Sequence, residues 1–230
     1  HDHFWGFWDN GDKAFDIARE LCQKSWNRWS VRSHRAEIIH EGQNSTYRAL
    51  TLKNFEKKVW KNLKSNNRLH CFTANVIDAK KGPERTYLQL ENGSHISAKT
   101  VFDSRPASLK DEVLLQHFLG LKIQSEKKIF DPSTAILMDF RVSQEEGIHF
   151  IYLLPFTEQV ALVESTVFSE RPMTPAWYKK NIRKYLIDYY ACQDFIIHSS
   201  ESGIIPMCFS SVNSSIGIPI GIRAGALRAS

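Results

Sequence analysis

The stretch from Val160 to Phe168, with the sequence VALVESTVF, restricts the fold more than any other part of the chain. Successive side chains of a β-strand point to opposite faces. One face carries Val160, Leu162, Glu164, Thr166 and Phe168, and the other carries Ala161, Val163, Ser165 and Val167. Both faces are almost entirely apolar, which is typical of a strand that is covered on both sides. We therefore predict a sheet with a protein layer on each face.

Glu164 is the exception within this strand. Burial of a carboxylate removes its hydration, which raises the pKa and favours the protonated form. The neighbouring residues of the strand offer no cation. Two interpretations stay open, a hydrogen-bonded structural acid and a Brønsted acid. Asp139 differs because Arg141 lies two residues further on and shares its face, so an ion pair is the alternative to a chemical role.

Composition narrows the class of protein. The chain has 230 residues, of which 42% are hydrophobic, enough for one large domain or two modest ones. The net charge is +5 and the pI about 9.0, but the basic residues are scattered over two probable helices. They form either solvated faces or a surface that attracts phosphate groups of a membrane or a nucleotide. No nucleic-acid-binding motif is present, so we expect no nucleic-acid partner.

Several other classes are excluded by missing patterns. No run approaches the roughly 18 apolar residues of a membrane-spanning helix. The 4 cysteines have no C-x-x-C spacing, which argues against a zinc ribbon and favours a reducing, cytoplasmic setting. His1-x-His3 has no third partner, so we expect no metal site. G-x-S-x-G, Walker A and H-E-x-x-H motifs are absent as well.

The periodicity predicts helices alternating with strands, followed by an antiparallel meander. Helices are expected near residues 12–24, at 51–63, and from a Thr174 N-cap with Pro175 to about Tyr190. Strands are expected at 29–40 (a strand or hairpin arm), 70–78, 86–90, 95–103, 136–142, 148–154 and 160–168. An Asn-Gly turn at 92–93 joins two of them. The pattern suggests an α/β domain with an inserted antiparallel sheet.

Eight short segments form an ordered set of motifs along the chain. They are His3-Phe-Trp5 with Phe7-Trp8, Asp103-x-Arg105, Gln116-x-Phe118-x-Gly120, Leu137-Met-Asp139-Phe, Phe150-Ile-Tyr152-x-Leu154-Pro155, Glu164-Ser-Thr166, Glu201-x-Gly203-x-Ile205-Pro206 and Gly221-x-Arg223-Ala-Gly225. Together they resemble the lycopene cyclases, flavoproteins of carotenoid synthesis. The resemblance covers almost the whole chain, and the order of the motifs makes it specific.

The resemblance implies an α/β (α+β) fold, in which an incomplete Rossmann-like FAD-binding domain carries an inserted antiparallel sheet for the substrate. The implied domains are 1–105 for part of the FAD-binding domain, 106–204 for the substrate domain and 205–230 for the return to the FAD-binding domain. The fingerprint G-x-G-x-x-G of dinucleotide-binding folds is absent. We therefore interpret the chain as an internal fragment without its main flavin cradle, and expect it to be inactive alone.

The implied activity is that of a lycopene β-cyclase, an isomerase of the intramolecular lyase class. An acid cyclises the acyclic ψ-ends of lycopene to β-ionone rings, giving γ-carotene and β-carotene without net redox change. Reduced FAD is the implied cofactor, and NAD(P)H its source of electrons. By position, Glu164 matches the acid/base glutamate of the family, and Asp139 is expected to assist it.

The remaining site residues are also carried over from the resemblance. Phe118, Phe150 and Tyr152 are expected to line the substrate site and stabilise a cation. The expected cofactor-binding residues are His3, Trp5, Asp103, Arg105, Gly221 and Gly225.

Lycopene and related acyclic carotenoids dissolve in the bilayer, so the intact protein is expected to be cytoplasmic and to touch the membrane peripherally. The oligomeric state stays open. Two alternatives remain. One is another flavoprotein of this fold, such as a prenyl reductase or hydroxylase, in which Glu164 would be structural. The other is a non-catalytic remnant that binds lipid or membrane.

Overall fold

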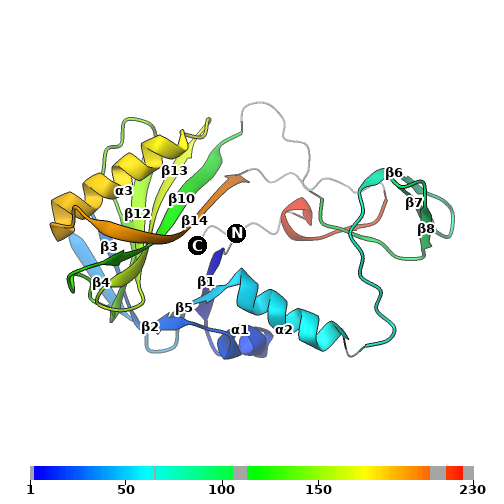
Figure 1. Cartoon of the computed structure of the whole chain (residues 1–230), viewed down its shortest axis with the longest axis horizontal. Coiled ribbons are helices and arrows are strands. Elements are labelled where there is room, and N and C mark those ends of the chain that lie inside the picture. Colours follow the sequence, from blue (N-terminus) through cyan, green and yellow to red (C-terminus); the bar gives the residue numbers. More distant parts are fainter. Residues whose placement is uncertain (1–2, 65, 106–112, 208–215, 225–230) are drawn as a thin grey trace. The chain divides into compact units, whose positions relative to one another are not determined.

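The computed structural model describes residues 3–64, 66–105, 113–207 and 216–224, which form two compact units (Figure 1). Unit 1 consists of His1–Asn62 and Leu114–Pro206, and unit 2 of Leu63–Val113 and Met207–Ala229. The sequence boundaries grouped 1–105 together, whereas in the structure strands from the first 62 residues pair within the large sheet of unit 1. Assignment of the units to flavin and substrate stays a prediction.

A seven-stranded sheet forms the centre of unit 1 (Figure 1). In spatial order its strands are β14 (Phe195–Pro206), β10 (Leu115–Ser125), β13 (Val160–Ser169), β12 (Ile148–Pro155), β11 (Thr134–Asp139), β3 (Arg28–Arg32) and β4 (Glu37–Glu41). All neighbours are antiparallel except β11 and β3, which are parallel. The predicted meander of β11, β12 and β13 and the predicted hairpin arm of β3 and β4 are confirmed.

Helix α3 (Pro175–Tyr190) covers one face of this sheet. Thr174 is the N-cap, as predicted, and its side chain accepts a hydrogen bond from the Trp177 N–H at 3.3 Å. The helix ends at Ala191, which adopts a left-handed conformation (φ 49°). The core on this side contains Leu121, Ile123, Ile151, Ala161, Val163, Val167, Ile182 and Leu186.

A three-stranded sheet packs against the other face of the large sheet. Its strands, in spatial order, are β1 (Phe4–Asp9), β5 (Thr46–Thr51) and β2 (Lys24–Trp26). Trp26 is fully buried, and its indole N–H donates to the Pro155 carbonyl at 3.2 Å. The second core contains Trp26, Tyr47, Ala49, Phe150, Tyr152, Leu154 and Leu162, with Phe168 packed against it. The predicted two-sided covering of the 160–168 strand is confirmed, with the predicted division of its residues.

The helix predicted at 12–24 is shorter than expected. It consists of a 3₁₀ turn, η1 (Lys13–Phe15), and α1 (Asp16–Glu20). The chain then leaves the helix because Gln23 N donates to the Ala49 carbonyl at 2.8 Å and Lys24–Trp26 pairs with β5. Strand pairing outweighs the local helical periodicity here. Helix α2 (Leu52–Lys64) agrees with the prediction for 51–63.

Unit 2 contains two small sheets. The first is formed by β6 (Val76–Lys81), β7 (Thr86–Leu90) and β8 (His95–Ala98), and Gly93 turns between the last two with a positive φ of 82°. The second pairs β9 (Phe102–Asp103) in parallel with β15 (Ile218–Pro219), which leads into the 3₁₀ turn η2 (Gly221–Ala224). The strand expected at 70–78 begins only at Val76, and that expected at 95–103 is divided. Among the described helices, none has the length and apolar composition to cross a membrane.

Candidate functional site

A row of four cross-strand partners brings two acids to one face of the large sheet. On β10, Gly120 pairs with Glu164 of β13 on one side and with Glu201 of β14 on the other. Tyr152 of β12 is the next partner of Glu164. Directly opposed residues of antiparallel strands point to the same face. One row, here called the carboxyl row, is therefore formed by Glu201, Gly120, Glu164 and Tyr152, and it faces the second core.

Gly120 leaves the space that the two acids share. A Cβ atom at this position would lie 3.1 Å from Glu201 Cγ, 3.3 Å from Glu201 Oε1 and 3.3 Å from Leu162 Cδ1. The side chain of Glu201 thus extends across Gly120, toward the strand that carries Glu164. A larger residue between the two strands would fill the volume that lets the carboxyl groups face each other.

A second row beside the first supplies aromatic rings and a hydroxyl group. Phe118, Thr166 and Phe150 are cross-strand partners on β10, β13 and β12. The Thr166 hydroxyl donates to Glu164 Oε1 at 2.7 Å, which orients the carboxyl group. The rings of Phe150 and Tyr152 meet edge to face, with centroids 5.2 Å apart. The structure therefore brings all three predicted substrate-lining residues to the face of Glu164.

The environment of Glu164 favours its protonated form. The side chain is only partly exposed, and burial raises the pKa of its carboxyl group to about 8. The nearby Glu201 carboxyl acts in the same direction, and the hydrogen bond from Thr166 partly opposes both. Burial likewise raises the pKa of the Tyr47 hydroxyl, with Tyr152 and Glu164 contributing. At neutral pH the site therefore presents a neutral carboxylic acid between phenols and rings.

Glu201 is held at the N-terminal start of β1. Its Oε2 accepts the Phe4 N–H at 2.8 Å, and His3 Nδ1 lies 3.5 Å from the same oxygen. His3 and Glu201 line a pocket of about 140 Å³ together with Leu119, Ser200 and Ser202. His3, predicted as a cofactor residue, is thus placed beside the second acid. Sequence reasoning gave Glu201 no role, although its Glu-x-Gly-x-Ile-Pro motif was a signal.

Trp5 and Asp139 are not brought to the carboxyl row. Trp5 alternates with Phe4 along β1, so it faces away from the second core, and its ring lies 5.2 Å from that of Phe55 in α2. Asp139 pairs with Ile151 of β12, a residue of the core under α3. Its side chain is fully buried on that face, opposite to the face of Glu164.

Asp139 takes part in an ion pair. Arg141 donates from Nε to Asp139 Oδ1 at 2.8 Å and from a terminal nitrogen to Oδ2 at 2.6 Å, and the Tyr185 hydroxyl donates to Oδ2 at 2.7 Å. Burial raises the pKa of this carboxyl group, but the hydrogen bonds from Arg141 and Tyr185 outweigh it, and the net pKa is lowered. Asp139 is therefore an ionised acceptor with its donors in place, as the ion-pair interpretation expects.

Three further predicted cofactor residues lie together in unit 2. Asp103 ends β9, is buried, and accepts Arg105 Nε at 2.9 Å and a terminal Arg105 nitrogen at 3.0 Å. Arg223 Nε lies 3.0 Å from Asp103 Oδ2, the oxygen that also accepts the terminal Arg105 nitrogen. Gly221 starts η2 with a positive φ of 61°, and apart from its chain neighbours none of the described residues has an atom within 4 Å of the position of its missing Cβ. Gly225 lies outside the described residues.

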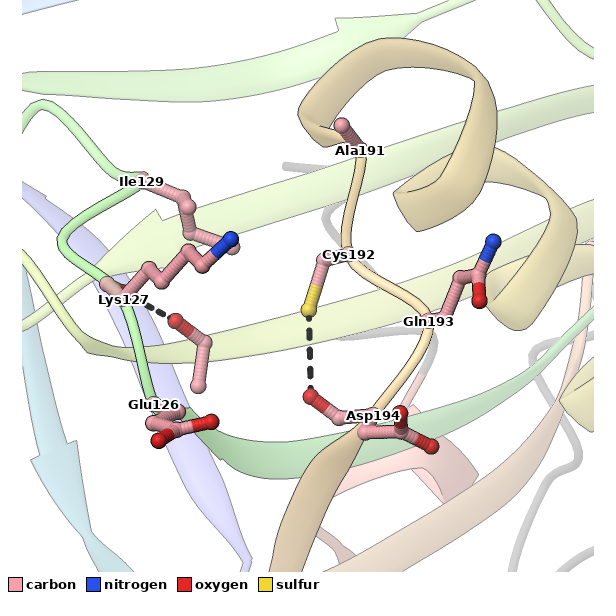
Figure 2. A pocket seen from close by; sticks show the side chains of 8 residues that line it. Glu126, Lys127, Ile129, Ala191, Cys192, Gln193 and Asp194 are labelled. Carbon is pink, nitrogen blue, oxygen red and sulfur yellow. Dashed lines mark hydrogen bonds between the residues drawn. The ribbon is translucent and has the colours of Figure 1, made fainter.

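Figure 2 shows a different pocket, of about 230 Å³, at the C-terminal end of α3. Its lining includes Glu126, Lys127, Cys192 and Asp194, and the Cys192 thiol donates to the Asp194 carbonyl at 3.5 Å. None of the predicted site residues that the structure describes lines it. The carboxyl row, rather than this pocket, is the candidate site.

Comparison with known proteins identifies the family of the chain. All 230 residues, 1–230, match the family model described as "Lycopene cyclase protein". The chain belongs to the lycopene cyclase family. It is 25% identical over 193 residues to a lycopene beta-cyclase of Pseudescherichia vulneris, covering 78% of this chain and 46% of that protein. It is 30% identical over 132 residues to a lycopene beta-cyclase of Pantoea ananas, covering 54% and 32%. The chain thus spans less than half the length of these relatives, and the predicted family is confirmed.

Solved structures show the same fold. A geranylgeranyl bacteriochlorophyll reductase-like protein of Thermoplasma acidophilum superposes with a TM-score of 0.69 at 12% identity, covering 96% of this chain and 61% of that one. A salicylate hydroxylase, solved as a substrate complex, gives 0.62 at 11% identity, covering 96% and 65%. Halogenase PltM, solved with phloroglucinol and FAD, gives 0.53 at 9%, covering 86% and 48%. The predicted mixed α/β, Rossmann-like fold is confirmed.

Proposed function

We propose that the whole protein cyclises the acyclic ends of lycopene to β-ionone rings, giving γ-carotene and β-carotene, with Glu164 as the acid. The observation that carries this proposal is the placement of the Glu164 carboxyl group on a face of buried aromatic side chains, where burial favours its neutral form. The pKa of Glu164 is raised to about 8, so it is protonated at neutral pH without needing a second proton donor. An acid of this kind suits an apolar substrate that can be activated only by protonation.

The reaction balances within the substrate and one carboxyl group. Glu164 gives its proton to the terminal double bond, which leaves a tertiary carbocation on the substrate and a carboxylate on the enzyme. The neighbouring C5=C6 double bond attacks the cation and closes the ring. Loss of a ring proton to the Glu164 carboxylate then forms the new double bond, and the product has the same atoms as the substrate. The hydroxyl of Thr166, at 2.7 Å from Oε1, holds the carboxyl group in one orientation.

The aromatic face stabilises the positive charge. Ring faces attract cations through their electron-rich centres, by about 0.5–2 kcal/mol for each favourable pair. Phe150 and Tyr152 are buried beside Glu164, and Phe118 belongs to the same face. Their burial also excludes water, which would otherwise add to the cation and give an alcohol.

Reduced FAD is the proposed cofactor, with NAD(P)H as its source of electrons. The residues of unit 2 fit part of such a site, because half-exposed Arg105 carries a positive charge beside Asp103 and Gly221 allows a close approach of the backbone. Arg105 and Gly221 would hold phosphate or ribityl groups. When bound, the reduced flavin supplies an electron-rich ring system that stabilises positive charge, with no net redox change.

We also propose that the protein meets its hydrocarbon substrate at the cytoplasmic membrane surface. Lys53, Lys57 and Trp60 follow one another at i, i+4 and i+7 of α2 and share one exposed face. Lysine side chains attract anionic headgroups, and an exposed indole ring suits the interface between headgroup and hydrocarbon. This face of α2 is the surface we propose for docking.

The proposed activity is tested with the full-length protein in cells that accumulate lycopene. Wild type is expected to form cyclic products with the mass of lycopene, and Glu164→Gln to leave lycopene unconverted, because the amide cannot donate a proton to an alkene. Glu126→Gln, at an exposed acid, is the matched control. Normal cyclisation by Glu164→Gln would contradict the assignment. Products with added hydrogen or oxygen would indicate the reductase or hydroxylase alternative, and no conversion by wild type the lipid-binding alternative.

A further inference from the structure

The two acids of the carboxyl row sit in different environments. Glu164 belongs to β13, the third strand from the edge of the large sheet, and its environment raises its pKa to about 8. Glu201 belongs to β14, the edge strand, and lines the pocket of about 140 Å³. A backbone N–H from Phe4 at 2.8 Å and the His3 ring at 3.5 Å meet its Oε2. The Phe4 N–H stabilises negative charge on Glu201, whereas Glu164 accepts a hydrogen bond from the Thr166 hydroxyl.

Other titratable groups lie near the row on β12, β5 and β10. Tyr152 projects from β12 and Tyr47 from β5, and both are buried phenols. Lys122, two residues after Gly120 on β10, has its Nζ over the rings of Phe4 and Phe156, at 5.4 and 5.3 Å from the centroids. The lysine therefore engages one ring from β1 and one ring that directly follows β12. Glu201 is the acidic neighbour whose charge raises the pKa of Glu164.

We propose that Glu201 is a positioning residue that remains ionised and, from across Gly120, keeps Glu164 protonated between turnovers. The use of that proton rests on the proposed function. Two opposed carboxyl groups cannot both ionise without repulsion, so an anchored charge on one favours the neutral form of the other. Gly120 is needed because its missing side chain leaves Glu201 Cγ and Oε1 in the space between the strands.

The same arrangement accounts for the return of the proton. After Glu164 has protonated the alkene, two carboxylates face each other across Gly120. Their repulsion makes Glu164 the stronger base, so the proton released when the ring double bond forms goes back to Glu164. One proton leaves Glu164 and one returns, which restores the starting state without an external acid. Glu201 neither gains nor loses a proton in this cycle.

The test is a titration of Glu164 in the full-length protein without substrate. Carbon-13 NMR of labelled glutamate carboxyl groups, with Glu164→Gln as the assignment standard, gives its pKa directly. Glu201→Gln keeps an oxygen for the Phe4 N–H but removes the charge. We expect it to lower the pKa of Glu164 by about one unit, the size of one partly screened like charge. Glu126→Gln is expected to leave that pKa unchanged.

Turnover supplies the second measurement. At pH 8 the protonated fraction of Glu164 would fall from about one half to about one tenth, so Glu201→Gln should lose about fivefold in rate, while at pH 6 it should match wild type. Glu201→Asp, which keeps the charge, should restore much of the pH 8 activity. A Glu164 pKa that does not move in Glu201→Gln, or an equal loss of rate at both pH values, would overturn the proposal. The NMR result is independent of the reaction, so it separates this proposal from the failure of the cyclase assignment.

Discussion

Asp139→Asn is the substitution that separates a structural from a chemical role at the second predicted acid. Wild-type Asp139 is fully buried and accepts hydrogen bonds from Arg141 and from the Tyr185 hydroxyl. Asparagine has nearly the same shape, but its amide nitrogen is a donor where a carboxylate oxygen accepted. One donor of Arg141 or Tyr185 is left without its acceptor, and the Arg141 charge loses its counter-ion.

The size of the loss follows from burial. Removing one partner of a buried ion pair costs about 3–5 kcal/mol. The side chain of Arg141 is 24% exposed, so water can hydrate it in part after the substitution. We therefore expect a loss at the lower end, about 3 kcal/mol in the free energy of unfolding at pH 7. The pKa of Asp139 is lowered in the folded state, so the stability that it contributes is present above about pH 4 and fades as the pH falls through the folded value.

The assay is urea denaturation of full-length wild type and Asp139→Asn, followed by tryptophan fluorescence at pH 7 and at pH 3. Tyr185→Phe and the double variant complete a cycle, in which we expect a coupling of about 1.5 kcal/mol for one hydrogen bond to a charged group. Cyclisation of lycopene is measured in parallel, normalised to folded protein. If Asp139→Asn kept full stability and lost the reaction, the ion-pair interpretation would be wrong and Asp139 would act in the chemistry.

Two further predictions concern pH and the membrane. The buried His149 ring donates from Nδ1 to the Ser143 carbonyl at 2.9 Å, and burial lowers the pKa of the ring. The free energy of unfolding should therefore fall below about pH 6.5, by up to about 1.4 kcal/mol per pH unit. In urea denaturation at several pH values, His149→Gln should flatten this slope, and an unchanged slope would refute the reasoning. Replacing Lys53 and Lys57 by Glu should weaken binding to phosphatidylglycerol vesicles in flotation assays by at least about thirtyfold. The same change at the exposed pair Lys179 and Lys180 on α3 should have little effect. Equal losses of binding in the two variants would contradict docking through α2.

Much of the large sheet could be predicted because its signal is local. The two apolar faces of Val160–Phe168 required cover on both sides, and the structure supplies α3 on one and the three-stranded sheet on the other. Thr174 and Pro175 marked the start of α3 through cap chemistry that depends only on adjacent residues. In each case the physical cause lies within a few positions of the chain, so the local sequence is enough to predict the element.

Elements whose form depends on distant partners could not be predicted in the same way. The stretch at 12–24 has helical periodicity, but Lys24–Trp26 is drawn into pairing with β5, so the helix ends early. The sequence pattern predicts no strand for β10, although Leu115–Ser125 is a long strand of the large sheet, because its alternation is interrupted by Gln116, His117 and Gly120. Those residues make sense only beside their neighbours, where Gly120 faces two acids and His117 bonds to Tyr178 of α3.

The candidate site also has one residue that its own strand reveals and one that depends on distant partners. Glu164 could be found from its own strand, since an acid with apolar neighbours is anomalous wherever the strand lies. Glu201 lies 37 positions after it in the sequence and one strand away from it in the sheet, and only the order β14-β10-β13 brings the two to one row. Had β14 paired one residue out of register, Glu201 would point to the face of α3 and leave Glu164 without an acidic neighbour. The acidity of Glu164 is therefore a property of strand order and register as much as of its own burial, which is why the Glu201→Gln titration tests the fold and the site together.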